Sequence, residues 1–513
     1  MFIRHNDKAS ARHDQIWNAR LTMHLGIDVG TQSVKALIFD PDGVGVRAVH
    51  AAPLALTSAD DGTREQLAEW WITALRSAVT GLPDDLRNAV RGIGVSGQQH
   101  GFVPLGAGGE VLAPVKLWCD TATAPECDEL MEAFGGAQAC ISELGNPILP
   151  GYTASKILWL RKHRPEAYAQ LDTILLPHDY INFVLTGEKV MEAGDASGTG
   201  LLNVYTRSWH AGMLAALDPD RDLTAALPDL VPADRAIGTL RADIAAELGL
   251  PPGIPVAPGG GDNMLAAIGT GSVAAGRMTV SLGTSGTLFA SADAPVVDPA
   301  GNLAAFCSST GNWLPLVCTM NCTVATELGR GLFDVGIAAL EAEINAAQPG
   351  AGGVMTLPFF NGERTPNLPG GKGCVLGLTE NNYRRGNLLR SAMESAVYGL
   401  RAGLDTFRSL ECPVERITLT GGGAGSASWR QMVADLFNMP VLVQANDEGA
   451  ALGAALQSLW LVEGGDLPGL VDELLTLDEA RCCEPAADNV DTYATHYDNY
   501  LRHVQAIAPL YSD

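Results

Sequence analysis

Alternating hydrophobic and polar positions predict three consecutive strands near the start of the chain. The run HLGIDVG after Met23 alternates up to a turn at Gly30-Thr31, and the alternation resumes in TQSVKALIFD. A strong turn signal follows at Asp40-Pro41-Asp42-Gly43, and VGVRAV after it alternates again. We therefore expect three antiparallel strands joined by tight turns.

The pattern then changes to one of helix and strand. The segment LAEWWITALRSAV has the apolar spacing of a helix, and GIGVSG, which begins at Gly92, reads as another strand. A strand meander followed by alternating helix and strand is typical of a mixed sheet with helices on its faces. The predicted class is therefore α/β.

The second half of the chain restarts in the same way. The run MTVSLGTSGTLFAS around Val280 again reads as strand, Gly-Thr turn and strand, so Gly283-Thr284 lies about half a chain length after Gly30-Thr31. An internal duplication explains this best and predicts two lobes around a cleft. We place the boundary in the Pro/Gly-rich tract near Pro258, which gives domains at 23–258 and 259–513. Residues 1–22 lack the apolar core of a signal peptide and are expected to be a disordered extension.

The composition of the chain limits the kinds of molecule that it is expected to bind. The 513 residues include 58 acidic and 33 basic side chains, for a formal charge of −25. Such a surface repels nucleic acid and anionic membranes, so a polyanionic ligand must be held locally by backbone N–H groups or a metal ion. No apolar run is long enough to span a bilayer, and the ten cysteines lack the paired spacing of a zinc site. We expect reduced thiols in a cytoplasmic protein.

The two Gly-Thr turns are candidate phosphate sites. Glycine allows backbone N–H groups to approach phosphate oxygens, a threonine hydroxyl can donate a hydrogen bond, and Asp28 can hold Mg²⁺ through water. One such turn alone is more often an ordinary hairpin. Two similar hairpins from two similar halves, however, can clasp one triphosphate from opposite sides. The candidates are Asp28, Thr31, Gly283, Thr284 and Ser285.

A glycine-rich strand-to-helix turn is a candidate nucleotide contact. A strand with Ile417 and Leu419 leads into the tract 421–424, GGGA, and the following helix has one apolar face that ends before Pro440. Glycines at this position permit a flat nucleotide to lie against the backbone. Neither GxxxxGK[ST] nor a GxGxxG after the first strand occurs, so P-loop and dinucleotide folds are disfavoured.

Two further motifs carry candidate chemistry at the cleft. In Gly259-Gly260-Gly261-Asp262-Asn263 a carboxylate opens a helix, and we expect it to be exposed and able to act as general base toward a sugar hydroxyl. A simple helix cap is an equally good interpretation of Asp262 alone. Gln99-His100, bracketed by glycines directly after a strand, offers hydrogen-bonding groups for a polyol.

These motifs together resemble the FGGY carbohydrate kinases, within the superfamily that contains sugar kinases, actin and the Hsp70 ATPase. The resemblance runs from about Met23 to the C-terminus. Two further stretches match family signatures, GYTASKILWLRKH with Gly151, Thr153, Lys156 and Trp159, and GCVLGLTENNYRRGNLLRSAME with Gly373, Gly377, Asn387 and Glu394. The fold implied is a pair of actin-like (ribonuclease H-like) domains with a central cleft.

The resemblance also implies a reaction and roles for residues. The tracts LLPHDYINFVLTGE, EAGDASGTG, PFFNGERTP and GGGDN are most similar to the members that phosphorylate D-xylulose to D-xylulose 5-phosphate with ATP and Mg²⁺. Asp262 would be the catalytic base, and Gln99, His100 and Asn263 would contact the sugar. Asp28 would lie near Mg²⁺ and phosphate, and Thr31 and Thr284 would touch phosphates. Gly422, Gly423 and Ala424 would lie beside the adenosine.

The sequence leaves alternative sugar acceptors and an alternative function open. Gln99 stands where bacterial members of this kind usually have Met, so L-xylulose, ribulose or gluconate are alternative acceptors. Glycerol is disfavoured because no Arg-Glu pair accompanies Gln99-His100. A non-catalytic nucleotide switch like actin would have no use for a polyol-binding turn. Asp120, Lys156 and Arg364 are second-rank candidates for the cleft, and a homodimer is left open.

Overall fold

The predicted N-terminal meander is present in the computed structural model, which describes residues 22–43 and 45–511. The extension expected at 1–22 lies outside the described residues except for Thr22. In the first sheet the central strand β1 pairs antiparallel with β2 and parallel with β6, β2 pairs antiparallel with β3, and β6 also pairs with β15 and β16. The bounds are β1 (Met23–Val29), β2 (Ser33–Asp40), β3 (Gly45–Pro53), β6 (Val90–Gly97), β14 (Gly238–Thr239), β15 (Pro255–Val256) and β16 (Gly260–Gly261).

The second sheet repeats this order of pairing. Its central strand β17 pairs antiparallel with β18 and parallel with β22, while β18 continues antiparallel to β19 and β22 continues parallel to β23. The same sequence of antiparallel and parallel neighbours in both sheets confirms the internal duplication. The bounds are β17 (Gly276–Leu282), β18 (Gly286–Ala290), β19 (Leu316–Thr319), β22 (Val414–Thr420) and β23 (Val441–Val443).

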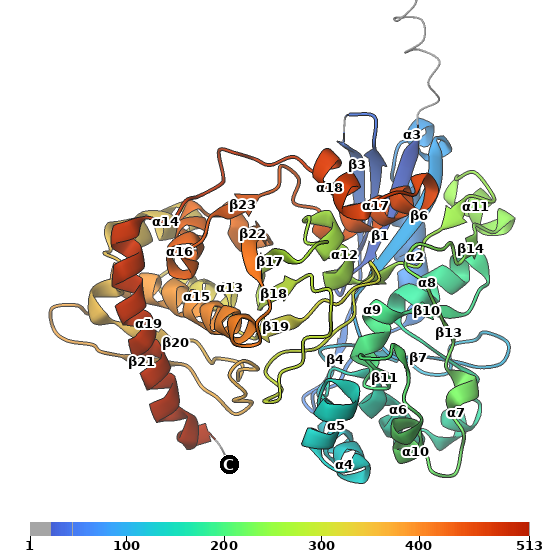
Figure 1. The fold of residues 1–513 in the computed structure, drawn as a ribbon, viewed down its shortest axis with the longest axis horizontal. Coiled ribbons are helices and arrows are strands. Elements are labelled where there is room, and N and C mark those ends of the chain that lie inside the picture. The colour runs from blue at the N-terminus through green and yellow to red at the C-terminus, as the bar shows by residue number, and fades with distance from the viewer. Residues whose placement is uncertain (1–21, 44, 512–513) are drawn as a thin grey trace, which may run out of the picture.

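Helices cover both sheets (Figure 1). On the first sheet, α2 (Ala68–Thr80) packs against β2 and β3, while α17 (Gly449–Glu463) packs against β1 and β6 and also against α12 (Asp262–Gly269). The second unit is covered by the helices α13 (Thr323–Leu332), α14 (Ile337–Ala346), α15 (Arg385–Ser409), α16 (Ala427–Phe437) and α19 (Ala487–Ile507).

A largely helical region with its own apolar core is inserted into the first unit. It contains α4 (Ala124–Phe134), α5 (Ala137–Leu144), α6 (Thr153–His163), α7 (Pro165–Ala169), α9 (Ala193–Ala196) and α10 (Ala211–Leu217), with α8 (Pro177–Thr186) and α11 (Ala242–Leu248) leading back to the sheet. In the described part of the chain no helix is long and apolar enough to cross a membrane.

The two units are joined by an apolar cluster. It combines Leu37 and Phe39 of the first sheet with Phe289 and Leu316 of the second, around α12 and α17. Because β16 belongs to the first sheet and α17 returns to it from near the C-terminus, chain segments cross between the units more than once. The domain boundary near Pro258 therefore stays a prediction.

Candidate active site

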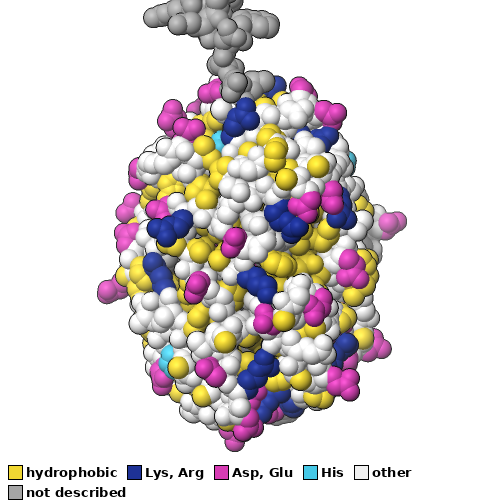
Figure 2. All heavy atoms as spheres, turned by 90° about the vertical axis from the view of Figure 1, so that its right-hand side faces the viewer, with side chains coloured by type: hydrophobic (Ala, Val, Ile, Leu, Met, Phe, Trp, Pro, Cys, Tyr) yellow, Lys and Arg dark blue, Asp and Glu magenta, His cyan; other side chains and the backbone are white. Residues whose placement is uncertain are grey.

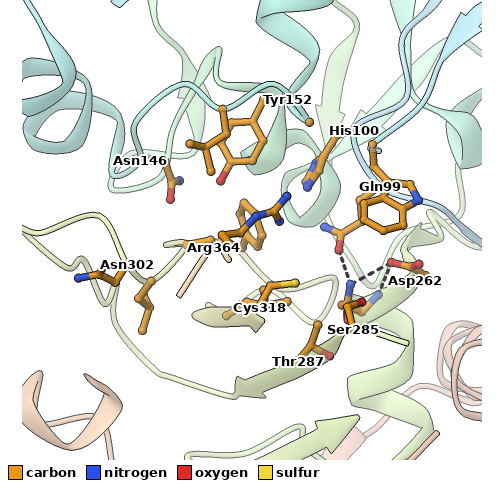
Figure 3. Close-up of a pocket in the computed structure, with 18 of the residues that line it drawn as sticks. Gln99, His100, Asn146, Tyr152, Asp262, Ser285, Thr287, Asn302, Cys318 and Arg364 are labelled. Atoms are coloured by element: carbon orange, nitrogen blue, oxygen red, sulfur yellow. Dashed lines mark hydrogen bonds between the residues drawn. The ribbon is translucent and has the colours of Figure 1, made fainter. Parts of the chain in front are cut away.

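A cavity of about 260 Å³ opens between the two units, and we call it the central pocket. Residues from loops of both units line it, and Figure 3 shows their side chains pointing toward a common space. The polar and charged lining residues are Gln99, His100, Asn146, Tyr152, Asp262, Asn263, Ser281, Ser285, Thr287, Asn302 and Arg364. All four predicted sugar-site residues, Gln99, His100, Asp262 and Asn263, therefore share one cavity.

Asp262 stands at the first position of α12, directly after the short strand β16. Its Oδ1 accepts hydrogen bonds from the backbone N–H of Asn263 at 2.8 Å and from Asn263 Nδ2 at 3.0 Å. The same Nδ2 donates to Gln99 Oε1 at 2.7 Å (Figure 3). Asp262 is only partly exposed, because the pocket walls surround it, so the expectation of an exposed carboxylate is wrong.

The surroundings of Asp262 favour its protonated form. Burial, and then the negative charges of Asp28 and Asp195, raise the pKa of Asp262 to about 7. A carboxyl group with a pKa near neutrality accepts a proton much more readily than an ordinary carboxylate. This environment suits a general base, whereas a helix cap alone would not require it.

Gln99 and His100 follow the end of β6 and offer unpaired polar atoms. Within the described residues, Gln99 Nε2 and His100 Nδ1 are buried and have no hydrogen-bond partner, and His100 Nδ1 faces Asp195 Oδ1 at 3.8 Å, away from the pocket lining. A buried donor without a partner costs free energy, so the Gln99 amide in the cavity lining indicates a ligand that pairs with it. Burial, aided by the charges of Lys156 and Arg364, lowers the pKa of His100 well below its usual value, so the imidazole is neutral.

The backbone of His100 is held from both sides. The residue has a positive φ of 62°, which is uncommon for a non-glycine residue. Its N–H donates to Asp195 Oδ1 at 3.4 Å, and its carbonyl accepts from Lys156 Nζ at 2.7 Å and Thr153 Oγ1 at 3.1 Å. Lys156 also donates to the carbonyl of Gly151, a second lining residue. Lys156 thus supports the pocket from behind without lining it.

The imidazole of His100 is enclosed by rings and by a glycine. Its centroid lies 5.1 Å from that of Tyr152 and 5.4 Å from that of Phe306. A Cβ on Gly198 would lie 1.9 Å from His100 Cε1, so only glycine fits there. Behind it, Asp195 pairs with the buried His178 at 3.1 Å. His178 is fully buried and lies outside the pocket lining.

Asp28 lies at the end of β1, near Asp262. Its Oδ1 accepts a hydrogen bond from Ser96 Oγ at 2.8 Å. Burial raises the pKa of Asp28, and this opposes the lowering effect of Ser96 and the charge of Lys35. Its own charge in turn raises the pKa of Asp262. Two carboxylates close enough to repel each other are a suitable setting for a divalent cation or for a shared proton.

The first hairpin turn borders the central pocket through a tryptophan. Thr31 Oγ1 donates to Gln98 Oε1 at 3.0 Å and accepts from Nε1 of Trp118, a lining residue, also at 3.0 Å. Because the hydroxyl proton of Thr31 is already used, a phosphate would meet the backbone of this turn rather than that hydroxyl. The assignment of Thr31 to phosphate binding stays a prediction.

The second hairpin turn faces the same cavity. Gly283 and Ser285 line the central pocket, whereas Thr284 between them is exposed. The carbonyls of Gly283 and Thr284 accept hydrogen bonds from Thr323 and Cys322, where α13 begins. These contacts fix the turn with Ser285 directed into the pocket (Figure 3).

The glycine-rich turn lies beside the second hairpin but outside the pocket lining. A Cβ on Gly423 would lie 2.7 Å from the Cβ of Leu282, the residue before Gly283. Ala424 is fully buried, and Gly422 is exposed with open space around its Cα. Ser426 caps α16 by accepting a hydrogen bond from the N–H of Trp429 at 3.1 Å. The contact of Gly422, Gly423 and Ala424 with adenosine stays a prediction.

The sequence reasoning missed several lining residues. Tyr152 lies inside the GYTASK stretch, and Arg364 in NGERTP was only a second-rank candidate, so motifs were present for both. Phe306 and Asn302 belong to an irregular loop without a motif, and no sequence signal marks them. Asp120 does not line the pocket, since its carboxylate pairs with Lys116 at 3.0 Å.

The residues present could hold Mg²⁺ only together with a ligand. Within residues 22–43 and 45–511, no cluster of three or more His, Cys, Asp or Glu side chains could hold a metal ion alone. Mg²⁺ typically takes one or two protein carboxylates and completes its octahedron with phosphate oxygens and water. Asp28, with Asp262 nearby, fits that requirement.

The fold and the pocket define a two-unit α/β phosphotransferase of the carbohydrate kinase type, and comparison with known families agrees. Residues 23–269 match the N-terminal domain of the FGGY family of carbohydrate kinases, and residues 278–461 match its C-terminal domain. The chain therefore belongs to the FGGY family of carbohydrate kinases.

Curated relatives of similar length support this assignment. The chain is 42% identical over 492 residues to a xylulose kinase of Haemophilus influenzae, which covers 94% of this chain and all of the relative. It is 34% identical over 494 residues to a xylulose kinase of Escherichia coli, with 95% of this chain and all of the relative covered.

Solved structures show the same fold. A crystal structure described as a xyloylose kinase from Brucella ovis has a TM-score of 0.88 and 32% identity, over 95% of this chain and all of that one. A gluconate kinase from Lactobacillus acidophilus, at 23% identity, has a TM-score of 0.89 over 96% of this chain and 99% of that one, and this likeness concerns the fold alone. The predicted fold class, two actin-like domains around a central cleft, is confirmed.

Proposed function

We propose that this protein transfers the γ-phosphoryl group of ATP to the hydroxyl at carbon 5 of D-xylulose, giving D-xylulose 5-phosphate and ADP. The full-length relatives named xylulose kinase support the acceptor, and membership of the carbohydrate kinase family supports the chemistry. The observation that carries the proposal is Asp262, a carboxylate of raised pKa in a cavity shared with the unpaired NH₂ group of Gln99 and the imidazole of His100.

Asp262 acts as the general base in this proposal. Its carboxylate accepts the proton of the sugar hydroxyl while the hydroxyl oxygen forms a bond to the γ-phosphorus. The bond between that phosphorus and the β-γ bridging oxygen breaks, and its electron pair leaves with ADP. Asn263 holds Asp262 Oδ1 through two hydrogen bonds and keeps the carboxylate oriented.

The two hairpin turns position the triphosphate. The backbone of the turns at Gly30-Thr31 and Gly283-Thr284, with Ser285, would face the phosphate oxygens from the two units. Asp28 would hold Mg²⁺, which neutralises phosphate charge when bound. The adenosine would lie against Gly422, Gly423 and Ala424, next to the second turn.

Gln99 and His100 bind the sugar. The neutral imidazole can both donate and accept, and the Gln99 amide presents its free NH₂ group to the cavity. Tyr152 and Phe306 exclude water from the far side of the imidazole. A desolvated acceptor site limits transfer of the phosphoryl group to water.

The first test is ADP release with ATP and Mg²⁺ in the presence of different acceptors. D-xylulose should give a far higher rate than L-xylulose, D- or L-ribulose, gluconate, glycerol or no sugar. A preference for another polyol would be consistent with a sugar kinase, and it would point to Gln99 as the residue that changes the acceptor. Turnover that does not depend on sugar would favour a nucleotide switch and overturn the proposal.

The second test removes the base. Asp262→Asn should lower kcat by about 10²–10⁴, because general-base catalysis contributes that much, while binding of ATP changes little. Asp218→Asn is a matched control, since Asp218 is also buried and hydrogen-bonded, to Tyr168 at 2.6 Å, but lies outside the pocket. Near-normal turnover of the Asp262→Asn protein would remove the base assignment.

Location, assembly and domain division also remain proposals. All ten cysteines are free, and this supports a reducing compartment such as the cytoplasm. A homodimer is left open. We propose two domains, at 23–258 and 259–513. The repeated sheet order supports two related units, with the short strand β16 of the second range pairing with the first sheet.

A further inference from the structure

Arg364 is the only lysine or arginine among the residues that line the central pocket in the described part of the chain. It belongs to the segment between β20 (Met355–Leu357) and β21 (Cys374–Leu376) of the second unit. Figure 3 shows its guanidinium directed toward His100 and Tyr152, two residues of the first unit. The positive charge acts on both, because it lowers the pKa of His100 and opposes the burial that raises the pKa of Tyr152.

The position of Arg364 is built into the fold. The neighbouring Glu363 is buried and accepts hydrogen bonds from the N–H groups of Met320 at 2.5 Å and of Arg364 at 2.9 Å. Asn321 Nδ2 donates to the other oxygen of Glu363 at 3.1 Å. These contacts anchor the backbone on one side of Arg364, so its side chain enters the cavity from a fixed base.

Among the described residues, the guanidinium of Arg364 has no oxygen partner. It contacts the thiol of Cys318, and across residues 22–43 and 45–511 its side chain forms no ion pair and no hydrogen bond to an oxygen atom. A guanidinium presents five N–H donors in a planar fork that suits two adjacent oxygen acceptors. Such a group, half-buried in an otherwise uncharged end of the pocket, indicates an oxygen-rich part of a ligand.

The position of Arg364 relative to Asp262 indicates which oxygen atoms of the ligand the guanidinium binds. The acceptor hydroxyl lies at Asp262, and from there the pocket continues past Gln99 to His100 and Arg364 (Figure 3). A five-carbon ketose phosphorylated at carbon 5 carries its carbon-1 hydroxyl and carbon-2 carbonyl at the opposite end. We propose that Arg364 is a specificity-determining residue, whose guanidinium binds these two oxygens and thereby selects a ketose. This inference rests on the proposed function for the identity of the sugar.

The test compares Arg364→Met, Arg364→Lys and the control Arg330→Met. Arg330 lies on α13 of the same unit, pairs with Glu327 and is outside the pocket. Arg364→Met should raise KM for D-xylulose about tenfold to a hundredfold, with KM for ATP little changed, because hydrogen bonds from a charged donor are lost. Arg364→Lys keeps the charge but not the fork, and it should show an intermediate KM. Arg330→Met should behave as wild type.

Xylitol, in which the carbonyl is reduced to a hydroxyl, probes the contact itself. The wild-type preference for D-xylulose over xylitol, expressed as a ratio of kcat/KM values, should fall in Arg364→Met. An unchanged KM for D-xylulose, or an equal loss for both sugars, would overturn the proposal. A loss in kcat and in KM for ATP would instead place Arg364 at the phosphates and would also overturn it.

Two controls distinguish a loss of sugar binding from misfolding and from a wrong identification of the sugar. Thermal unfolding of each variant shows whether a loss reflects misfolding, and Arg364→Lys provides a second variant if Arg364→Met does not fold. If the wild-type protein prefers another ketose, the proposed function fails, but the same comparison with that ketose and its alditol still tests Arg364.

Discussion

At the scale of single residues, the protonation of Asp262 should control the rate. Burial and the charges of Asp28 and Asp195 raise its pKa to about 7, and only the deprotonated form can accept the sugar proton. We expect kcat/KM for D-xylulose to rise with pH up to about 7 and then to level off. Rate measurements across this range at constant Mg²⁺ would show it. A rate independent of pH between about 5 and 8 would contradict the assignment.

The same carboxylate should lower the stability of the protein at alkaline pH. A carboxyl group whose pKa is raised on folding stabilises the native state at low pH, and that contribution is lost as pH rises through about 7. Asp262→Asn removes the buried charge, so we expect the variant to be more stable than wild type by about 1–3 kcal/mol at about pH 8. The difference should shrink toward about pH 5. Urea unfolding at both pH values measures it, and a less stable variant at about pH 8 would refute it.

Asp195 acts as a positioning residue for His100. It accepts the backbone N–H of His100 and pairs with His178, both inside the first unit. Asp195→Asn weakens both contacts, so we expect KM for D-xylulose to rise about tenfold, with little change in KM for ATP. The control Asp218→Asn should leave both values unchanged. Equal losses for sugar and ATP would indicate a general structural role instead.

At the scale of elements, the close packing of α12 and α17 holds Asp262 in place. A Cβ on Gly453 of α17 would lie 1.7 Å from the carbonyl oxygen of Leu265 in α12, so the two helix backbones are nearly in contact. Only the absence of a side chain permits this approach. The helix that begins with Asp262 is thereby fixed against a helix that packs on the first sheet.

Gly453→Ala should therefore be strongly destabilising. The added methyl group meets backbone atoms that cannot rotate away, so we expect a loss of about 2–4 kcal/mol in the free energy of unfolding. Gly331→Ala in α13 is the matched control, because a Cβ there meets nothing within 4 Å. It should be neutral or stabilising by up to about 1 kcal/mol. Similar unfolding curves for both variants would contradict the packing argument.

At the scale of the whole molecule, the central pocket is open between two units that both contribute to it. The turns proposed to bind phosphate and the residues proposed to bind sugar come from both units, so a ligand that contacts both favours a closed arrangement. We expect the radius of gyration to decrease when D-xylulose and a non-hydrolysable ATP analogue bind together. Small-angle X-ray scattering would detect the change, with D-xylulose alone as the comparison. Identical scattering with and without both ligands would exclude closure.

One face of the molecule shows how its surface charges are distributed. On the face shown in Figure 2, acidic and basic side chains are interspersed among polar and apolar ones. The net charge of −25 means that the global field repels ATP rather than attracting it. The proposed binding of ATP therefore depends on local groups, the N–H donors of the turns and a cation held at Asp28.

Local patterns in the sequence were enough to predict the repeated strand meander, the Gly-Thr turns and the helix that opens at Asp262. These features depend on local periodicity and turn chemistry, which the residue order carries directly. Local motifs also marked six residues that line the pocket, Gln99, His100, Asp262, Asn263, Gly283 and Ser285. The resemblance to a family added the pair of actin-like domains, and the apolar face of α16 was predicted correctly for the same local reason.

Contacts between groups far apart in the chain could not be predicted from the sequence and are known from the folded structure. Phe306 and Asn302 reach the pocket from an irregular loop, and Arg364 comes from another, so no periodic pattern marks them. The backbone of His100 is held by hydrogen bonds to Asp195 and Lys156. The pKa of Asp262 is raised by burial and by the charge of Asp28, which lies more than two hundred residues earlier in the chain. Burial and electrostatic coupling are properties of neighbours in space, and neighbours in space are set by folding rather than by sequence spacing.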